Sequence, residues 1–143
     1  MIRLAKKSDT QQIVALNEQF HLAIGEFVWD KPSWVVKEIS KGNFFVIEKE
    51  GAILGAECLK SQARTLFIET IAVKKELHNQ GIGRALIEHA KKKAKQLKKN
   101  TLTVESFFSY GLRGFYEKCG FKPDSPHVGH YNERPYYKFV MQV

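Results

Sequence analysis

The sequence is poor in the residues that build disulfide-linked or metal-stabilised folds. Its 143 residues include two cysteines, Cys58 and Cys119, which lie far apart and form no CxxC pair. We therefore expect two reduced, partly buried thiols rather than a disulfide framework. The five histidines form no HExxH pattern, so the sequence gives no support for a metal site.

Long apolar runs and targeting signals are missing as well. Charge begins at Arg3, so the N-terminus lacks the apolar stretch of a signal peptide. No apolar run reaches the roughly 20 residues that a membrane helix needs. The chain has no repeat and no low-complexity linker. We expect one domain over residues 1–143, a cytoplasmic location and no membrane partner.

Positive charge is what the chain has in excess. It carries 23 Lys and Arg against 15 Asp and Glu, a net charge of +8. Charge alone indicates an anionic partner: nucleic acid, a membrane surface or a phosphorylated cofactor. The lysines of residues 91–99 lie on the polar arc of a predicted helix, with few aromatic residues to stack on bases. We interpret them as a solvated face, with a basic nucleic-acid-binding module as the main alternative.

Alternating and helical spacings predict an α/β (α+β) chain. Early hairpins followed by a helical crossover favour a mixed central β-sheet of about six to seven strands with helices on both faces. Strands are predicted at 2–5, 44–48, 52–59, 64–73, 101–105, from 121, and 136–141. Helices are predicted before residue 21, at 33–40, after 83 and at 112–119, with a polar loop at 122–134.

A glycine turn between a strand and a helix is the most informative local feature. Residues 78–84 read HNQGIGR, after an apolar strand and before an amphipathic helix. Such a turn lets backbone N–H groups converge on an anion at the positive end of the helix. A flexible loop with a glycine N-cap is the alternative. A P-loop and a dinucleotide-binding fingerprint fit worse, because Gly-Lys-Ser/Thr and a third glycine are missing.

Two segments resemble the acyl-CoA-binding signature of the GNAT family of N-acetyltransferases. Residues 69–86 match both glycines of the pattern Arg/Gln-x-x-Gly-x-Gly/Ala and the strand before it, with His78 in place of Arg or Gln. Residues 115–121 read FYEKCGF and match F-Y-x-x-x-G-F, while Ser109 stands where many relatives have asparagine. The resemblance covers roughly the last two-thirds of the chain.

The resemblance implies a GNAT fold and an acyltransferase. Acetyl-CoA would be the co-substrate, and a primary amine of a small molecule or peptide would be the acceptor. Transfer would be direct in a ternary complex, because no cysteine occupies an acyl-carrier position in the glycine motif. The departures at His78 and Ser109 leave a non-catalytic acyl-CoA-binding domain as an alternative. A homodimer is compatible with the sequence, and we do not expect a nucleic-acid partner.

The same resemblance assigns the cofactor site. Main-chain N–H groups of residues 79–84 would hold the pyrophosphate, and Ile71 and Val73 would pair with the pantetheine arm. Tyr116 would be the general acid that protonates the leaving thiolate, although it also lies on an apolar stripe typical of a core tyrosine. The implied cofactor-binding residues are Ile71, Ala72, Val73, His78, Asn79, Gln80, Gly81, Ile82, Gly83, Arg84, Ser109 and Tyr116.

Glu69 is the candidate base. A protonated amine must lose a proton before it can attack a thioester, and a carboxylate near the acetyl group can accept that proton. Glu69 lies on the strand before the glycine turn among apolar neighbours, although an exposed edge glutamate is equally compatible. Glu105 is the reserve candidate. Trp29 and Trp34, with Glu105, are the candidate acceptor-binding residues, although an exposed-rim or a core position is equally compatible with both tryptophans. We interpret His127 and His130 as solvated.

Overall fold

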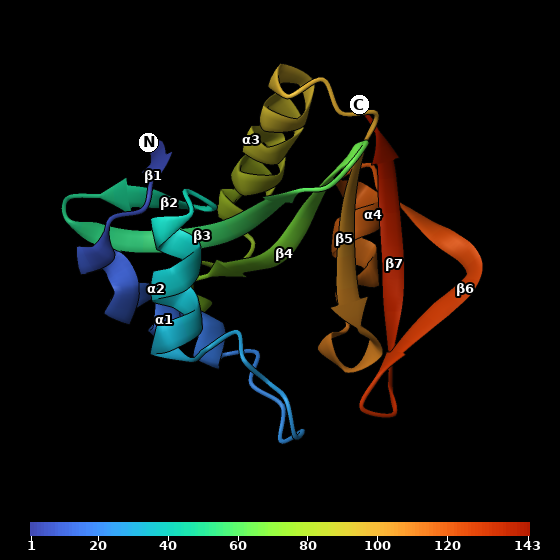
Figure 1. Cartoon of the computed structure of the whole chain (residues 1–143), viewed down its shortest axis with the longest axis horizontal. Coiled ribbons are helices and arrows are strands. Elements are labelled where there is room, and N and C mark those ends of the chain that lie inside the picture. Colours follow the sequence, from blue (N-terminus) through green and yellow to red (C-terminus); the bar gives the residue numbers. More distant parts are fainter. The chain divides into compact units, whose positions relative to one another are not determined.

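The computed structural model describes residues 1–124 and 128–143, in which seven strands form one mixed sheet with the order β1-β2-β3-β4-β5-β7-β6 (Figure 1). β4 and β5 are parallel, and β1–β2, β2–β3, β5–β7 and β6–β7 are antiparallel. The strands are β1 Ile2–Leu4, β2 Phe44–Lys49, β3 Ala52–Ser61, β4 Thr65–Val73, β5 Thr101–Phe107, β6 Lys122–Tyr131 and β7 Arg134–Gln142. The helices are α1 Thr10–Glu18, α2 Pro32–Ser40, α3 Ile82–Gln96 and α4 Arg113–Lys118, with short 3-10 turns η1 Lys7–Asp9, η2 Lys75–Leu77 and η3 Phe108–Tyr110.

The predicted fold class and strand number are confirmed. The residues group into a first unit, Met1–Leu59 with Thr70–His89, and a second unit, Lys60–Glu69 with Ala90–Val143. β3, β4 and α3 each pass from one unit into the other. The prediction of one domain over residues 1–143 stays a prediction.

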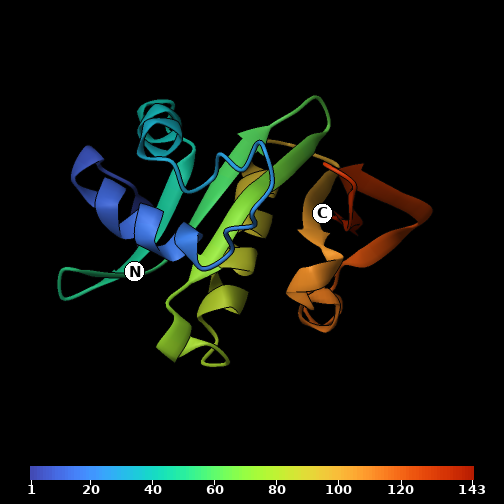
Figure 2. The same cartoon turned by 90° about the horizontal axis from the view of Figure 1, so that it is seen from below.

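In the first unit, helices cover both faces of the sheet (Figure 2). α1 and α2 bury Ile13, Leu16 and Val35 against one face, where Phe44 and Val46 of β2 form the same core. The start of α3 covers the opposite face. There Gly55 of β3 lies so close to Leu86 of α3 that an added Cβ would contact the leucine at 3.2 Å. A larger residue at this position would force the strand or the helix to give way by a few tenths of an ångström.

A buried carboxylate lies beneath α3 in the same unit. Glu57 of β3 is fully buried, and its Oε1 lies 2.8 Å from Nδ1 of His89 on α3. Its other oxygen, Oε2, has no hydrogen-bond partner among the described residues. Burial raises the pKa of Glu57 to about 7, and the nearby His89 opposes that shift. The pair links β3 to α3, but removing the carboxyl group from water costs stability.

The second unit is built on β4, β5, β7 and β6. Leu66 and Ile68 of β4 pair with Leu102 and Val104 of β5, and all four side chains are buried. Phe139 of β7 lies opposite Val104 and continues this buried face. α4 contributes its apolar side to the same core. The opposite face of these strands carries both polar and apolar side chains, including Phe67, Glu69 and Glu105.

The predicted polar loop at 122–134 is wrong. Most of it is β6, which pairs with β7 and turns at Asn132 and Glu133, both with positive φ. Its proline and glycine residues are typical of a loop. However, β6 is the edge strand of the sheet, where proline and irregular register are tolerated. His130 is exposed, as interpreted from the sequence, and His127 lies outside the described residues.

Within the described ranges 1–124 and 128–143, no helix combines the length and apolar character needed to cross a membrane.

Replacing Glu57 with Gln should remove a pH-dependent loss of stability. The pKa of Glu57 is raised from its ordinary 4.5 to about 7, so the unfolded chain releases this proton at lower pH than the native state does. The free energy of unfolding should therefore fall as pH rises from about 4.5 through 7, by on the order of 1–3 kcal/mol. Urea unfolding across this range should show the fall in the wild type and a flatter profile in Glu57→Gln.

The exposed carboxylate of Glu18 on α1 provides the control. Glu18→Gln should keep the wild-type pH profile. Equal slopes for wild type and Glu57→Gln would show that the buried carboxyl group does not cause the pH dependence.

Candidate functional site

The glycine turn links β4 to α3 in the first unit. After β4 ends at Val73, η2 leads into an exposed turn in which Asn79 and Gly81 have φ values of +66° and +85°. Left-handed residues at alternate positions let successive N–H groups face one side of the backbone. α3 begins at Ile82 and runs for 15 residues, so its unpaired N–H groups and its dipole add to that side. This geometry suits an anion.

His78 steadies this turn through its side chain. Its Nε2 lies 2.9 Å from the carbonyl oxygen of Val73. A carbonyl only accepts hydrogen bonds, so Nε2 carries the proton and donates it. Gln19, the residue after α1, donates to the same oxygen at 3.1 Å. His78, the residue that departs from the family pattern, thus links the turn back to the end of β4 through its side chain.

The burial of the remaining predicted cofactor residues depends on their place in β4 or in the exposed turn. Ala72 is 2% exposed and belongs to the core, whereas Ile71 and Val73 are half-buried. Asn79, Gln80, Gly81 and Arg84 are exposed, and Ile82 and Gly83 are half-buried at the start of α3. In the second unit, Ser109 is exposed within η3. The backbone-pairing roles of Ile71 and Val73 stay predictions.

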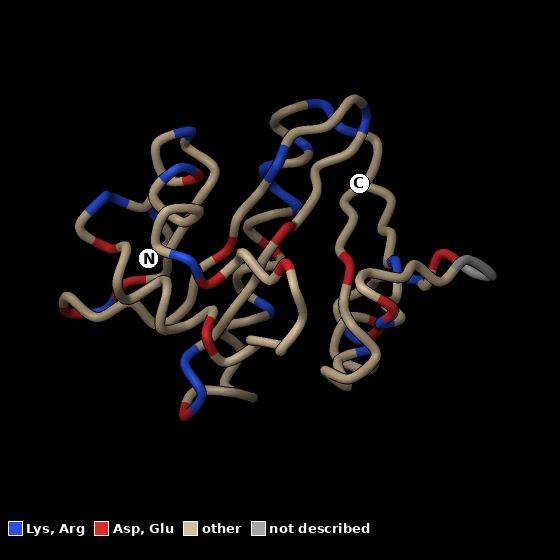
Figure 3. Tube along the Cα trace, turned by 60° about the horizontal axis from the view of Figure 1, so that its bottom comes forward, with Lys and Arg blue, Asp and Glu red and all other residues tan. Residues whose placement is uncertain are grey.

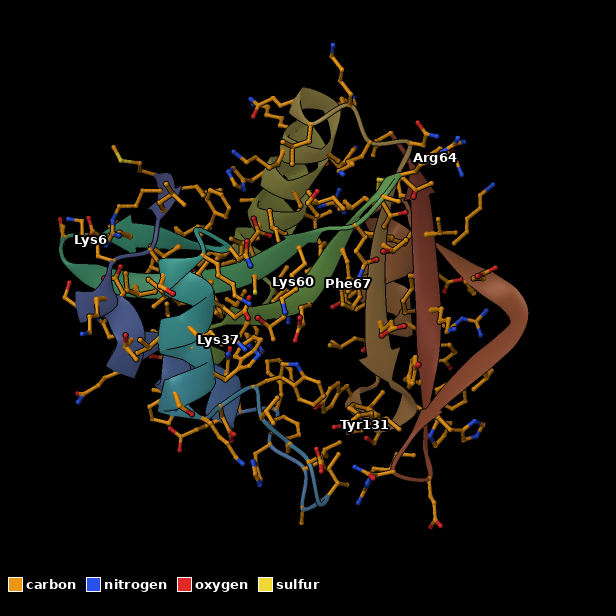
Figure 4. All side chains as sticks on the ribbon, in the orientation of Figure 1. Lys6, Lys37, Lys60, Arg64, Phe67 and Tyr131 are labelled. Carbon is orange, nitrogen blue, oxygen red and sulfur yellow. The ribbon has the colours of Figure 1, made fainter. Side chains whose placement is uncertain are left out.

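Glu69 and Glu105 lie on one face of the second unit. Ile68 of β4 pairs with Val104 of β5 in parallel register, so the next residues, Glu69 and Glu105, share the opposite face. Glu69 Oε1 lies 2.8 Å from Nζ of Lys60 on β3. Lys138 of β7 lies directly across from Glu105. The result is a row of four charged residues, called here the charge row, in which Glu69 and Glu105 lie between Lys60 and Lys138. Figure 4 labels Lys60 and Phe67 on the neighbouring strands β3 and β4.

The pKa of Glu105 is raised from its ordinary value. Partial desolvation of this otherwise exposed residue is the largest cause, Lys138 opposes the shift, and the negative charge of Glu69 adds to it. The two carboxyl groups therefore interact electrostatically, and one bears on the protonation of the other. Sequence reasoning found both carboxylates but missed Lys60 and Lys138, because only the strand register reveals that these lysines share the same face.

Tyr116 of α4 lies in the core, as its place on the apolar stripe of the sequence indicates. The residue is 3% exposed, and its ring packs on Phe139 and Phe121 with centroid distances of 5.1 and 5.8 Å. Burial raises the pKa of its hydroxyl well above the usual range. Tyr116 therefore keeps its proton at neutral pH, as a general acid must. Its catalytic role stays a prediction.

The segment between α1 and α2 holds Trp29 and Trp34 differently. Trp34 packs edge-on against buried Phe44 at a centroid distance of 5.7 Å, which favours the core alternative. Trp29 is half-buried, and its carbonyl accepts a hydrogen bond from Asn17 at 2.8 Å. His21 and Asp30, which sequence spacing gave no reason to pair, close the segment with an Nδ1–Oδ2 distance of 2.7 Å. The segment that carries Trp29 is thus held by contacts of Asn17 with the Trp29 carbonyl and of His21 with Asp30.

The lysine run follows the second half of α3 and the turn beyond it, where Figure 3 shows Lys and Arg in blue. Lys92, Lys95 and Lys98 are exposed. Lys99 differs, because its Nζ donates to the carbonyls of Gln62 and Ala63 at 2.7 and 3.3 Å. Cationic side chains near the end of a helix also interact favourably with its dipole. In the part of the chain that the structure describes, no group of His, Cys, Asp and Glu is arranged to hold a metal ion.

Comparison with known proteins places this geometry in a family. Residues 40–123 match the family model described as an acetyltransferase (GNAT) domain. No curated protein sequence matches the chain. Ard1 from Thermoplasma volcanium is similar in structure, with a TM-score of 0.84, 16% sequence identity and coverage of 100% of this chain and 97% of that one.

Two further similar structures contain coenzyme A. Rv2747 from Mycobacterium tuberculosis, solved with CoA and NLQ, has a TM-score of 0.81 and 18% identity, and the match covers 100% of this chain and 99% of that one. N-acetylglutamate synthase from Neisseria gonorrhoeae, complexed with coenzyme A and N-acetyl-glutamate, has a TM-score of 0.77 and 22% identity. That match covers 99% of this chain and 34% of the synthase chain.

These structural likenesses confirm the predicted fold, and acetyl-CoA as co-substrate fits the family model that the sequence matches. Since that model spans more than half of the residues, the chain belongs to the GNAT family of acetyltransferases.

Proposed function

We propose that this protein moves an acetyl group from acetyl-CoA to a primary amine of a small molecule or peptide. The observation that carries the proposal is the exposed turn at the start of α3, where Asn79 and Gly81 have positive φ and the helix presents its N-terminus. This is a backbone arrangement that favours phosphate groups. Membership of an acetyltransferase family supports the same reading.

The chain's own residues would bind and orient the acyl donor. Backbone N–H groups of residues 79–84 would hold the pyrophosphate, and the hydrogen bond from His78 to Val73 would keep the turn in shape. Ile71 and Val73, half-buried on β4, would pair with the pantetheine arm through their backbones. Acetyl-CoA supplies the activated thioester. The presence of CoA in two similar structures is compatible with this role.

Proton transfer would fall to the carboxylates and Tyr116. Glu69 would take the proton of the acceptor's ammonium group, with Glu105 as the second candidate on the same face. The hydroxyl of Tyr116, whose pKa is raised by burial, would give its proton to the leaving thiolate. We propose direct transfer in a ternary complex, because both cysteines are buried and so poorly placed to carry an acyl group.

Three broader predictions remain proposals. The buried thiols of Cys58 and Cys119 support a reducing, cytoplasmic location. Similar structures that match the whole of this chain support one domain over residues 1–143. We also keep a homodimer as compatible with the family.

Cofactor binding should depend on Gly83. We expect acetyl-CoA to raise the melting temperature, because a ligand that binds only the native state stabilises it. Gly83→Val should remove the shift while the protein stays folded, since the added side chain would hinder close approach of the pyrophosphate. Thermal melts with and without acetyl-CoA, backed by circular dichroism of each variant, provide the measurement.

Gly25→Val is the matched control, because a Cβ added at Gly25 meets open space. It should keep the wild-type shift. A wild type that shows no shift at millimolar acetyl-CoA would contradict the proposal. Salt-sensitive DNA binding without a CoA effect would instead favour the nucleic-acid alternative.

Loss of the base and loss of the acid should give different pH profiles. With free-thiol release as the assay over an amine library, Glu69→Gln should lower the rate by roughly ten- to a thousandfold and recover partly at high pH, where the amine is already neutral. Tyr116→Phe should lower kcat without that recovery and with little change in acetyl-CoA affinity.

Glu105→Gln, assayed in parallel, separates the two carboxylates. A wild-type profile for Glu69→Gln together with a defective Glu105→Gln would move the base to Glu105. An unchanged rate in Tyr116→Phe would show that the thiolate leaves unassisted. Absence of thiol release with every amine, in a protein that still binds acetyl-CoA, would favour the non-catalytic alternative.

A further inference from the structure

The two carboxylates of the charge row lie between two lysines. Lys60 is contributed by β3, Glu69 by β4, Glu105 by β5 and Lys138 by β7, so neighbouring strands in the sheet order supply one charge each. Lys60 and Glu69 form an ion pair with an Nζ–Oε1 distance of 2.8 Å, and Glu105 faces Lys138 across the antiparallel pair of β5 and β7. Both ends of the row are therefore cationic.

Adjacent carboxylates hinder each other's ionisation. Two negative charges on neighbouring strands favour a proton on one of them, and such pairs titrate together rather than singly. A carboxylate that holds a proton cannot accept one from an amine. Partial desolvation and the charge of Glu69 already raise the pKa of Glu105, and Lys138 counteracts them. The lysines thus favour the ionised state of the carboxylates, which a base needs in order to accept a proton.

The ion pair at Glu69 is also partly sheltered from water. The side chain of Glu69 is 16% exposed and that of Lys60 is 30% exposed. Screening by solvent weakens ion pairs at open surfaces, but it acts less on groups that are partly buried. A hydrogen-bonded ion pair of this length also fixes the direction in which the carboxylate points.

We propose that Lys60 and Lys138 are positioning residues that keep the Glu69–Glu105 pair ionised and oriented as a proton acceptor. The inference rests on the proposed function for its catalytic meaning, and it concerns residues that neither the family pattern nor the sequence singles out. The balanced step is simple. One proton passes from the acceptor's ammonium group to a carboxylate oxygen of the pair, which leaves a neutral amine and a neutral carboxyl group, and the carboxyl group later returns the proton to water.

The charged groups that face the Glu69–Glu105 pair within the second unit are the residues to substitute in a test. Lys60 approaches from β3 and Lys138 from β7, while each glutamate faces the other. α4 packs on the opposite face, where Tyr116 contacts Phe139. Removal of either lysine's charge should therefore change the protonation of the carboxylates that these lysines face.

Lys60→Met and Lys138→Met are the primary variants, because methionine keeps much of the side-chain length and removes the charge. The acid limb of kcat/KM against pH, measured with one acceptor, should move to higher pH by roughly half to one unit in each. Lys60→Arg and Lys138→Arg should stay near wild type. In a Glu69→Gln background, Lys60→Met should have little further effect, because its partner has lost its charge.

The control is Lys92→Met, which removes an exposed lysine from α3 and should leave the pH profile unchanged. A purely structural role for Lys60 would lower the melting temperature or the rate at every pH without moving the acid limb. An unmoved acid limb in folded, active Lys60→Met and Lys138→Met would overturn the inference.

A second measurement does not need turnover. Carbon-13 NMR of the glutamate carboxyl groups should show the titration of the Glu69–Glu105 pair at higher pH in Lys60→Met than in wild type, by a similar amount. Unchanged titration midpoints would overturn the inference even in an active enzyme. Absence of turnover in wild type would contradict the proposed function instead, and a shifted titration in that protein would still support the electrostatic coupling.

Discussion

The alternation of side chains along β4 is the constraint on which the rest of the structure depends. Leu66, Ile68 and Ala72 fall on the buried face, so Glu69, Ile71 and Val73 are placed on the other. A shift of one residue in register would bury Glu69 and expose the core positions. The same strand ends at Val73, whose carbonyl holds the His78 ring and Gln19. The alternation of β4 thus determines its core positions and the face that carries Glu69, and the end of the strand determines where the glycine turn begins.

Much of this could be read from the sequence because it is local. Alternation predicted both faces of β4, and the Gly-x-Gly spacing predicted a turn that the structure places at the start of α3. The Glu50–Gly51 hairpin turn was also predictable, because glycine favours the positive φ that such a turn requires. In the structure both residues have positive φ. The family pattern added the role of Tyr116, whose burial explains both its core packing and its retained proton.

What the sequence could not supply depends on register and on tertiary contacts. β6 looked like a loop, because proline and glycine mark turns locally, and only pairing with β7 makes it a strand. Lys60 and Lys138 looked like ordinary surface lysines until the strands placed them beside Glu69 and Glu105. The Glu57–His89 pair spans 32 positions, and neither residue shows its partner in any local motif.

The central claim is direct transfer of an acetyl group from acetyl-CoA to an amine, without an acyl-enzyme. Single-turnover reactions with isotope-labelled acetyl-CoA, quenched at intervals and analysed by mass spectrometry of both the intact protein and the acceptor, test it most directly. The account predicts that the label appears on the amine while the protein mass stays unchanged throughout. A protein that gains one acetyl group before the amine does, with the label at Cys58 or Cys119, would contradict it.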